Sequence, residues 1–594
     1  EMGVPQGSIL SPTLFNLKIN SIINCLSKDI DPSLYVDDFL ISYKSKNLNS
    51  MQRKLQLCLK KLEKWCDENG FKFSPQKTIC VHFTKSRKLH PEPELYLKGI
   101  KIPVKSEVKF LGLIFDKKLT FTPHIKYLKN KCLKALNLLK VVSRTDWGGD
   151  RKTLLHLYRS LIRSKLDYGS IVYGSARKTV LQMLDPIAHQ GLRLALGAFK
   201  SSPVESLYTE AEEPPLRLRR EKLSLQYALK LSSHPENPTY VNIFEPQYEN
   251  LYDAKEKAIR PLGLRLKPKL NDISFQLDHT VVEKIPDIPP WTLKPAKVNF
   301  EMTKAKKSDT AEILYISKFN EIIENHPGYS PIYTDGSKTD DAVAAAAVKG
   351  DQLVSKSYNK IISIFSAEVR ALELALKVIS KCIEVKHIIF SDSKSALEAI
   401  QDRWTLHPLV RRVLELHNEI RQTKDIIFCW VPSHVGIKGN EAADQEAKAA
   451  LVSPVSDPKV PASDWLPKST EYIKNQHKRH WDEIQNNKLK EIVPDLTKQH
   501  QIQCENRRDE VVLTRLRIGH SRLTHSFLMK GEPAPVCICC DAAYTIKHIL
   551  VDCVDFADAR KLFYTEIDMF NLFGKVTREK ILDFIREIGL YKKL

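Results

Sequence analysis

The sequence predicts a multidomain protein in which mixed α/β domains alternate with α-helical ones. The chain has 594 residues, more than one hydrophobic core usually supports, so we expect roughly three or four domains. Between residues 328 and 452, strand-like and helix-like segments follow in the order β-β-β-α-β-α-α-β-α, which is typical of a mixed sheet flanked by helices. Residues 117–234 instead repeat apolar residues at helical spacing, so this part should be helical.

The composition is that of a globular protein with excess positive charge. The 92 Lys and Arg residues outnumber the 71 Asp and Glu residues and give a net charge of +21. Such an excess favours RNA and DNA as partners, although a merely basic protein is the alternative. No apolar run approaches the ~20 residues that span a bilayer, and the start has no secretory signal pattern. We therefore expect an intracellular protein, nuclear or cytoplasmic or both, without a membrane partner.

The first block, residues 1–116, should be a small α/β domain. A turn with Gly and Pro over residues 2–12 precedes a predicted helix over residues 13–25. Asp37 and Asp38 follow between two apolar runs, which predicts a hairpin whose tip carries both carboxylates. A solvated turn is the commoner explanation for such a pair, so the neighbouring motifs decide its interpretation.

Those motifs resemble the reverse transcriptases of non-LTR retrotransposons. The Gly-Val-Pro-Gln-Gly-Ser segment at residues 3–8 precedes the aspartate pair, as it does in that family. Residues 70–78 resemble the family's lysine motif, and residues 109–112 resemble its primer-grip segment. Four motifs in the family's order make the resemblance specific.

The resemblance implies that residues 1–116 are a partial reverse-transcriptase palm with Asp37, Asp38 and Lys77 as remnants of its site. The family's further metal-binding aspartate should lie before Gly3 and is not in this sequence. Two-metal polymerisation needs that carboxylate. We therefore expect an N-terminally truncated polymerase that does not extend a primer.

The next region, residues 117–234, should be the helical thumb and connection that the resemblance implies. Apolar spacing predicts helices over residues 122–142, 151–166, 181–196 and 216–231. The first is rich in lysine, which suits either contact with a nucleic-acid backbone or a solvated face. Prolines then recur and helical spacing fades, so residues 235–327 should be a linker region with one short helix over residues 310–325.

Four acidic residues lie at strand ends or helix starts within residues 328–452. Asp335 ends the first strand, and Asp392 follows the fourth. Glu368 should lie in the first turn of a helix capped by Ser366, and Asp444 in the first turns of the last helix. Taken singly, each could be a turn or cap residue. Together they predict a site where mutually repelling carboxylates bind divalent cations, with Mg²⁺ or Mn²⁺ favoured by oxygen-only ligands.

The motifs around these acids resemble type 1 ribonuclease H, which follows the polymerase in some Jockey-like non-LTR elements. They lie at residues 334–337, 366–368, 391–393, 430–434 and 439–444. The resemblance implies two Mg²⁺ ions bound by Asp335, Glu368, Asp392 and Asp444. It also implies that His434, in a mobile loop, assists product release or proton transfer.

The implied reaction is two-metal hydrolysis of the RNA strand of an RNA–DNA hybrid. The enzyme would recognise its substrate through 2′-hydroxyl contacts and the shape of the DNA strand. Three further residues could contact the hybrid: Ser393, Lys438 and Asn440.

The tail, residues 453–594, should begin as a second proline-marked linker and continue as basic helices over residues 469–487 and 511–522. Cys537, Cys540, His548 and Cys553 then form C-x2-C-x7-H-x4-C, a closed tetrahedral set for structural Zn²⁺. Cys539 could replace a neighbour, and buried free cysteines are the alternative.

This Cys/His set resembles the C-terminal motif of the same retroelements, and the basic helices suggest nucleic-acid binding. Most of the 12 cysteines are scattered singly, which argues for reduced thiols.

The sequence thus favours an RNA–DNA hybrid endoribonuclease within a retrotransposon-derived reverse transcriptase. One alternative is an RNA-directed DNA polymerase when complete, and another is a catalytically inactive relic that only binds nucleic acid. A host ribonuclease H is disfavoured by the polymerase-like motifs upstream. Protein partners stay open.

Overall fold

The computed structural model describes residues 5, 7–86, 91–255, 258–285, 287–304, 310–496 and 504–594. The chain divides into two compact units: Glu1–Leu216 with Trp481–Leu594, and Arg217–His480. None of the described helices is both long and apolar enough to span a bilayer.

The first unit begins with helix α1 (Ser11–Asn20), the predicted hairpin and the long helix α2 (Leu48–Asn69). Strands β1 (Asp31–Tyr35) and β2 (Asp38–Ser42) pair antiparallel. Val36 takes a left-handed conformation with φ 55° in the turn, so the prediction of two aspartates at a hairpin tip is confirmed. Two more hairpins follow: β3 (Tyr96–Leu97) with β4 (Ile100–Lys101), and β5 (Glu107–Phe110) with β6 (Leu113–Asp116).

The helical region of this unit agrees with the predicted pattern. Helix α3 (Thr122–Val142) has the predicted bounds, and so has α10 (Leu216–Leu231), which leads into the second unit. Residues 151–167 form one continuous helix, in which the π-helical turn η2 (Arg159–Arg163) joins α4 (Arg151–Tyr158) to α5 (Ser164–Asp167). Helix α8 (Asp185–Leu196) starts later than predicted because Pro186 suits a first helical turn. The other elements are α6 (Ser170–Tyr173), α7 (Lys178–Leu181), η3 (Gln182–Leu184) and α9 (Val204–Ala211).

The tail packs on these helices through buried charges. The buried carboxylate of Glu210 forms ion pairs with Arg517 at 2.8 Å and with Arg151 at 3.2 Å. Burial alone would raise the pKa of Glu210, but the two guanidinium groups outweigh it and lower the pKa. The suggestion that the basic helix over residues 511–522 contacts nucleic acid is therefore wrong for Arg517, which is 5% exposed. Arg515 likewise donates from Nε to the carbonyl of Gly197 at 3.0 Å.

The tail elements surround their own apolar core, which includes Trp481, Leu516, Leu550 and Phe584. These elements are η8 (Lys488–Glu491), α20 (Arg507–Ile518), α21 (Arg522–His525), α22 (Phe527–Lys530), η9 (His548–Asp552), α23 (Ala557–Lys561), α24 (Met569–Lys575) and α25 (Arg578–Glu587).

The second unit is built on a seven-stranded mixed sheet of order β13-β10-β9-β8-β11-β12-β7. Strands β8, β9 and β10 form an antiparallel meander, and the remaining neighbours pair in parallel. Their bounds are β7 (Lys297–Asn299), β8 (Ser330–Lys338), β9 (Val343–Lys349), β10 (Gln352–Tyr358), β11 (Lys386–Ser391), β12 (Asp425–Trp430) and β13 (Val455–Asp457). From β8 onward the predicted order β-β-β-α-β-α-α-β-α is confirmed.

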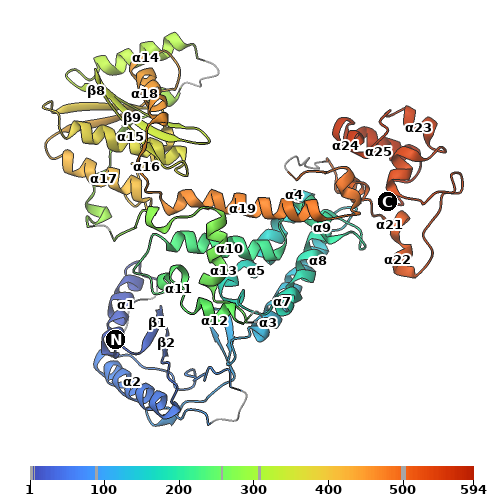
Figure 1. Ribbon diagram of the computed structural model, residues 1–594, viewed down its shortest axis with the longest axis horizontal. Coiled ribbons are helices and arrows are strands. Elements are labelled where there is room, and N and C mark those ends of the chain that lie inside the picture. The colour runs from blue at the N-terminus through green and yellow to red at the C-terminus, as the bar shows by residue number, and fades with distance from the viewer. Residues whose placement is uncertain are drawn as a thin grey trace. The chain divides into compact units, whose positions relative to one another are not determined.

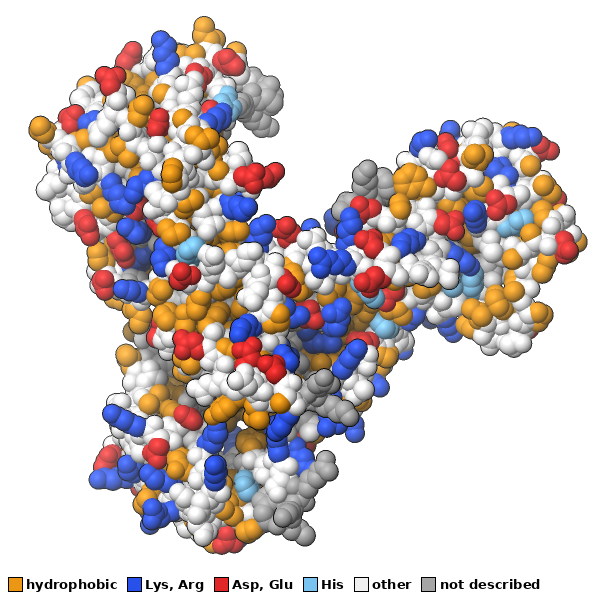
Figure 2. Space-filling view, in the orientation of Figure 1, with side chains coloured by type: hydrophobic (Ala, Val, Ile, Leu, Met, Phe, Trp, Pro, Cys, Tyr) orange, Lys and Arg blue, Asp and Glu red, His pale blue; other side chains and the backbone are white. Residues whose placement is uncertain are grey.

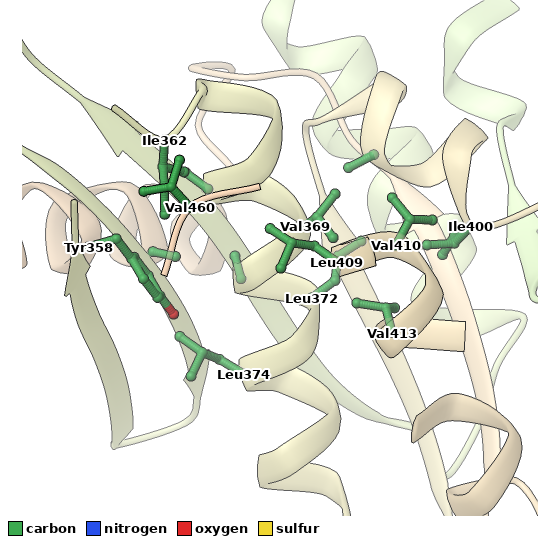
Figure 3. Close-up of a cluster of buried hydrophobic side chains, with 14 of the residues drawn as sticks. Tyr358, Ile362, Val369, Leu372, Leu374, Ile400, Leu409, Val410, Val413 and Val460 are labelled. Carbon is green, nitrogen blue, oxygen red and sulfur yellow. The ribbon is translucent and has the colours of Figure 1, made fainter. Parts of the chain in front are cut away.

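Helices cover both faces of this sheet (Figure 1). On one face lie α15 (Ile364–Ile379), α16 (Lys394–Ala399) and α17 (Pro408–Ile420). Figure 3 shows Val369 and Leu372 of α15 directed toward Leu409, Val410 and Val413 of α17, all buried. On the other face, α14 (Glu312–Glu324) contributes Tyr315 and Ile322 to a second apolar cluster, and α18 (Lys438–Ala449) packs against β8 and β9.

The proline-rich segments are not extended linkers, contrary to the prediction for residues 235–327 and for the start of the tail. The first contains α11 (Tyr240–Phe244), α12 (Glu249–Asp253), α13 (Leu262–Asp272) and strand β7. Leu266 and Leu270 of α13 and the nearby Leu293 are buried in the core of this unit. Prolines at helix starts and between anchored apolar residues are compatible with such packing. The second contains β13 and the start of α19 (Ala462–Glu483), with Pro467 inside that helix.

Replacement of Gly336 by alanine should destabilise the second unit by about 1–3 kcal/mol, because an added Cβ forces a close contact in a packed core. That Cβ would lie 2.8 Å from the backbone nitrogen of Glu368. Thermal unfolding followed by circular dichroism should show a lower melting temperature. Gly574→Ala is the control, since its Cβ meets no described atom within 4 Å. Equal melting temperatures for both variants would contradict this interpretation of the contact.

Candidate active site

Helix α15 carries Glu368 to strand β8. Its N-cap is Ser363, whose hydroxyl accepts a hydrogen bond from the backbone N–H of Ser366 at 3.1 Å. The prediction that Ser366 caps this helix is therefore wrong: Ser366 lies inside the helix and is fully buried. Since α15 starts at Ile364, Glu368 lies in its second turn and not in the first.

The parallel pairing of β8 with β11 places Asp335 and Asp392 side by side. In the parallel pairing of β8 with β11, Thr334 lies opposite Ser391, so the next residues along both strands are the two aspartates. Helix α15 crosses β8 closely enough that a Cβ on Gly336 would also meet the backbone of Ala367 at 3.0 Å. Consequently, one carboxylate oxygen from each of Asp335, Glu368 and Asp392 lies within 4.8 Å of the others.

This proximity makes all three groups hard to ionise. Burial, followed by the charges of Asp392 and Asp444, raises the pKa of Asp335 from 3.8 to about 7. Burial, followed by the charge of Asp335, raises the pKa of Glu368 well above its ordinary value. Burial also raises the pKa of Asp392. The backbone N–H of Gly336 opposes the first two shifts by hydrogen bonding.

Asp444 lies near this group but outside it. Its Oδ2 forms an ion pair with Nζ of Lys448, one turn further along α18, at 2.8 Å. Its charge still contributes to the raised pKa values of Asp335 and Asp392. The structure thus gathers three of the four predicted acids tightly and places the fourth at their margin, beside a lysine that the spacing i, i+4 supplies.

Two further residues hold Asp392 in place. The buried side chain of Asn440 forms a hydrogen bond with the Asp392 carboxylate, which opposes the rise in its pKa. Trp430 donates from Nε1 to the backbone carbonyl of Asp392 at 2.9 Å. The sequence marked Asn440 only as a possible contact to the hybrid, and Trp430 only as part of a motif. A contact that depends on the packing of α18 against β8 leaves no signal in local spacing.

His434 lies on an exposed loop with a left-handed backbone, φ 52°. Histidine adopts this region more readily than most residues. The buried side chains of Val435 and Ile437 anchor the loop from the following positions. The charge of His434 acts on Asp392 and opposes the rise in the pKa of that carboxyl, so this histidine lies near the acidic cluster.

The acidic cluster has the chemistry of a divalent-cation site. Among the described residues, Oε2 of Glu368 is buried without a hydrogen-bond partner. Three close carboxylates whose charged forms are disfavoured by burial gain from a hard cation with oxygen ligands. The residues present therefore fit Mg²⁺ or Mn²⁺.

The polymerase-like residues are more exposed to solvent than the acidic cluster. Asp37 and Asp38 are exposed at the tip of their hairpin, and Lys77 is exposed in a separate turn. In the part of the chain that the structure describes, none of them belongs to a group of three or more metal-binding side chains.

The predicted zinc ligands converge in the tail. Cys537, Cys540, His548 and Cys553 offer ligand atoms within 4.8 Å of one another. The sulfurs of Cys537 and Cys540 are each 3.9 Å from that of Cys553, close to the ~3.8 Å that tetrahedral Zn²⁺ with Zn–S bonds of about 2.3 Å imposes. His548 Nε2 is buried and lacks a partner among the described residues. Cys539 is exposed and outside the group.

Two family models match the chain. Residues 1–115 match the family described as reverse transcriptase (RNA-dependent DNA polymerase), and residues 328–452 match RNase H. The chain therefore carries a reverse transcriptase domain and an RNase H domain, two families that generally use divalent metals such as Mg²⁺.

Curated relatives narrow this class. The chain is 29% identical over 204 residues to the probable RNA-directed DNA polymerase from transposon BS of Drosophila melanogaster, covering 32% of this chain and 22% of the relative. It is 26% identical over 247 residues to the RNA-directed DNA polymerase from mobile element jockey of the same species, covering 40% and 26%. The resemblance to non-LTR retrotransposon reverse transcriptases with an RNase H domain is thus confirmed.

The matched part spans only about a quarter of these relatives. Among solved structures, RNase H1 from the archaeon Halobacterium salinarum NRC-1 aligns with 21% of this chain and 100% of its own at 24% identity, with a TM-score of 0.18. The fold assignment rests on the strand order and the family match instead.

Magnesium should stabilise the protein more at pH 8 than at pH 6. The folded state holds the Asp335 proton up to about pH 7, whereas the ordinary value is 3.8. Without metal, the free energy of unfolding therefore falls as pH rises through that interval. Mg²⁺ binds the deprotonated carboxylates and offsets the loss.

The measurement is the Mg²⁺-induced rise in melting temperature at the two pH values. Asp335→Asn should reduce the difference between them. A rise that is equal at both pH values in the unaltered protein would show that Asp335 does not titrate as stated.

Proposed function

We propose that the RNase H domain hydrolyses the RNA strand of an RNA–DNA hybrid. The observation that carries this proposal is the cluster of three buried carboxyl groups within 4.8 Å, with Asp444 at its margin. An RNase H family match over residues 328–452 supports the reaction class.

The residues of the cluster and its neighbours would have different roles in hydrolysis. Asp335, Glu368 and Asp392 would hold two divalent cations, and Asp444 would complete the ligand set. Divalent cations bound there supply an activated water and stabilise the leaving oxygen. Asn440 keeps the Asp392 carboxylate oriented through its hydrogen bond. His434, exposed on its loop, is placed to hold a proton near Asp392 or to help the product leave.

The substrate must be a polyanion. The net charge of +21 favours nucleic acid, and Figure 2 shows Lys and Arg side chains spread over the visible face of the molecule. RNA–DNA hybrids arise where RNA is copied, so we place the activity inside the cell, in the nucleus or cytoplasm.

RNA-directed DNA polymerisation is the second candidate. Its support is the family match over residues 1–115 and the hairpin tip with Asp37 and Asp38. We rank it below hybrid cleavage because the carboxylates of that hairpin do not join a larger metal-binding group among the described residues.

The tail cluster is proposed to bind one structural Zn²⁺. Burial raises the pKa of Cys553 to about 11, so its thiolate is disfavoured unless a cation compensates it. Three thiolates and one imidazole form a closed set with no open position for a substrate. The ion would therefore stabilise the tail and take no part in hydrolysis.

Asp392→Asn should lower cleavage of an RNA–DNA hybrid by at least about 100-fold, because loss of a ligand charge costs more than loss of a supporting contact. The assay is release of labelled RNA fragments in Mg²⁺, with single-stranded RNA as the substrate that should stay intact. Asp351→Asn, at an exposed loop position, is the charge-matched control. An Asp392→Asn protein that cleaves at the unaltered rate would falsify the assignment, and an inactive unaltered chain would favour the binding-only relic.

The zinc proposal predicts one Zn²⁺ per chain by inductively coupled plasma mass spectrometry. Cys553→Ser should lose the metal and lower the melting temperature, because thiolate ligation contributes directly to folding. Cys539→Ser should keep both, since Cys539 lies outside the ligand group. Loss of zinc from Cys539→Ser but not from Cys553→Ser would show that Cys539 is a ligand and Cys553 is not. Absence of zinc from the unaltered chain would contradict the zinc proposal.

A further inference from the structure

A second polar cavity lies in the unit that holds the acidic cluster. It has a volume of about 280 Å³, and its lining includes Lys297, His417, Arg421, Thr423, Lys424 and Asp425. It combines the end of helix α17, the start of strand β12 and the start of strand β7. None of these residues belongs to the candidate active site.

The cavity lies at the N-terminal ends of strands β12 and β7, whereas the acidic cluster lies toward the C-terminal ends of β8 and β11. In the parallel pair β11–β12, Lys386 lies opposite Asp425 at one end and Ser391 opposite Trp430 at the other. Asp392 follows Ser391 directly. Five residues of strand separate the two ends, or roughly 16 Å at about 3.3 Å per residue. A ligand in this cavity would therefore be distinct from the metal ions of the cluster.

Two polar atoms of the cavity lining are buried without partners. They are Nδ1 of His417 and Nη1 of Arg421, each unbonded among the residues that the structure describes. His417 is only 3% exposed. Buried polar groups are almost always hydrogen-bonded, since leaving them unpaired costs free energy. Both atoms belong to residues that line the cavity, and neither is paired within the described part of the chain.

The side chains that line the cavity carry a net positive charge. Lys297, Arg421 and Lys424 face one carboxylate, Asp425, which leaves two positive charges in excess. Asp425 is already engaged by Lys297 Nζ at 3.0 Å and by the hydroxyl of Tyr329. Lys424 donates only to neutral acceptors, the carbonyls of Cys382 at 2.7 Å and Glu384 at 2.9 Å. The charge of Arg421 and Lys424 is thus not neutralised locally.

A simpler interpretation is that these cations cap the end of helix α17. The capping groups are backbone amides instead: Arg421 N–H donates to the carbonyl of His417 at 3.0 Å, and Lys424 N–H donates to that of Ile420 at 3.1 Å. His417 also packs edge-on against Phe428, which accounts for its burial but not for its unpaired Nδ1.

We propose that this cavity binds a phosphate group. The fork of Arg421 suits two oxygens of a phosphate, and the two lysines add charge. The hydroxyl of Thr423 already donates to the carbonyl of Ile420 at 3.2 Å, so the cations carry the binding. Burial, followed by the charge of Arg421, lowers the pKa of His417 to about 4, so its ring is neutral near pH 7. The phosphate belongs either to a nucleic-acid strand that extends past the active site or to a free phosphate or nucleotide.

Binding is tested on the full chain by equilibrium dialysis with radiolabelled inorganic phosphate in Mg²⁺-free buffer of constant ionic strength. The unaltered protein should bind one phosphate per chain. Arg421→Gln should weaken binding at least about 10-fold, since a charge-assisted contact is lost. Lys297→Gln should also weaken it, and this variant does not depend on a buried position because its side chain is 64% exposed. Lys381→Gln, exposed and outside the lining, is the charge-matched control.

The proposal fails if the unaltered chain binds no phosphate, if Arg421→Gln and Lys297→Gln both bind like the unaltered chain, or if Lys381→Gln loses as much. Competition identifies the source. An RNA–DNA hybrid that displaces phosphate from the unaltered chain supports a backbone phosphate, whereas displacement by adenosine monophosphate and not by the hybrid supports a free ligand. Because the measurement needs neither Mg²⁺ nor turnover, it is independent of whether the chain cleaves hybrids.

Discussion

The close approach of helix α15 to strand β8 at Gly336 is the constraint on which the candidate active site depends. Without a side chain at this position, Glu368 comes beside Asp335, and the parallel register adds Asp392. The result is a group of carboxyls whose negative charge the protein hardly compensates. Such an arrangement is unfavourable by itself and favourable only with cations. The packing of a helix on a sheet thus creates the carboxyl cluster to which we assign metal binding.

The first unit resolves the same electrostatic problem in the opposite way. Glu210 is as buried as Glu368, yet its pKa is lowered where that of Glu368 is raised. The difference is the partner: two arginines surround Glu210, whereas aspartates surround Glu368. The arginines that neutralise Glu210 also hold the tail against the helical region. Glu368 has no such partner, so its charge would need a cation from solution. Burial alone therefore does not distinguish a structural acid from a candidate metal ligand, but the sign of its neighbours does.

Much of the second unit could be predicted because its signals are local. Apolar runs and helical spacing identify every strand and helix from β8 to α18. The prediction that Asp335 ends its strand is wrong, because β8 continues to Lys338, and only Asp392 directly follows a strand. Local sequence does not distinguish Ser363 from Ser366 as the cap of α15, because both can cap a helix and only the packing of Ser366 into the core decides between them. Recurring prolines likewise predict a linker where buried leucines such as Leu266 anchor the segment to the core.

The features that the sequence did not disclose share one cause: they depend on register between distant segments. Asn440 reaches Asp392 only because α18 packs against β8, where Gly439 lies so close that a Cβ would overlap the ring of Tyr333 at 2.2 Å. Lys297 likewise meets Asp425 only through the pairing of β7 with β12. A single residue type at a single spacing carries neither contact. Residues that recognisable motifs mark, such as Asp335 and Asp392, can be found by reading along the chain, whereas contacts between unmarked residues require the order of the strands.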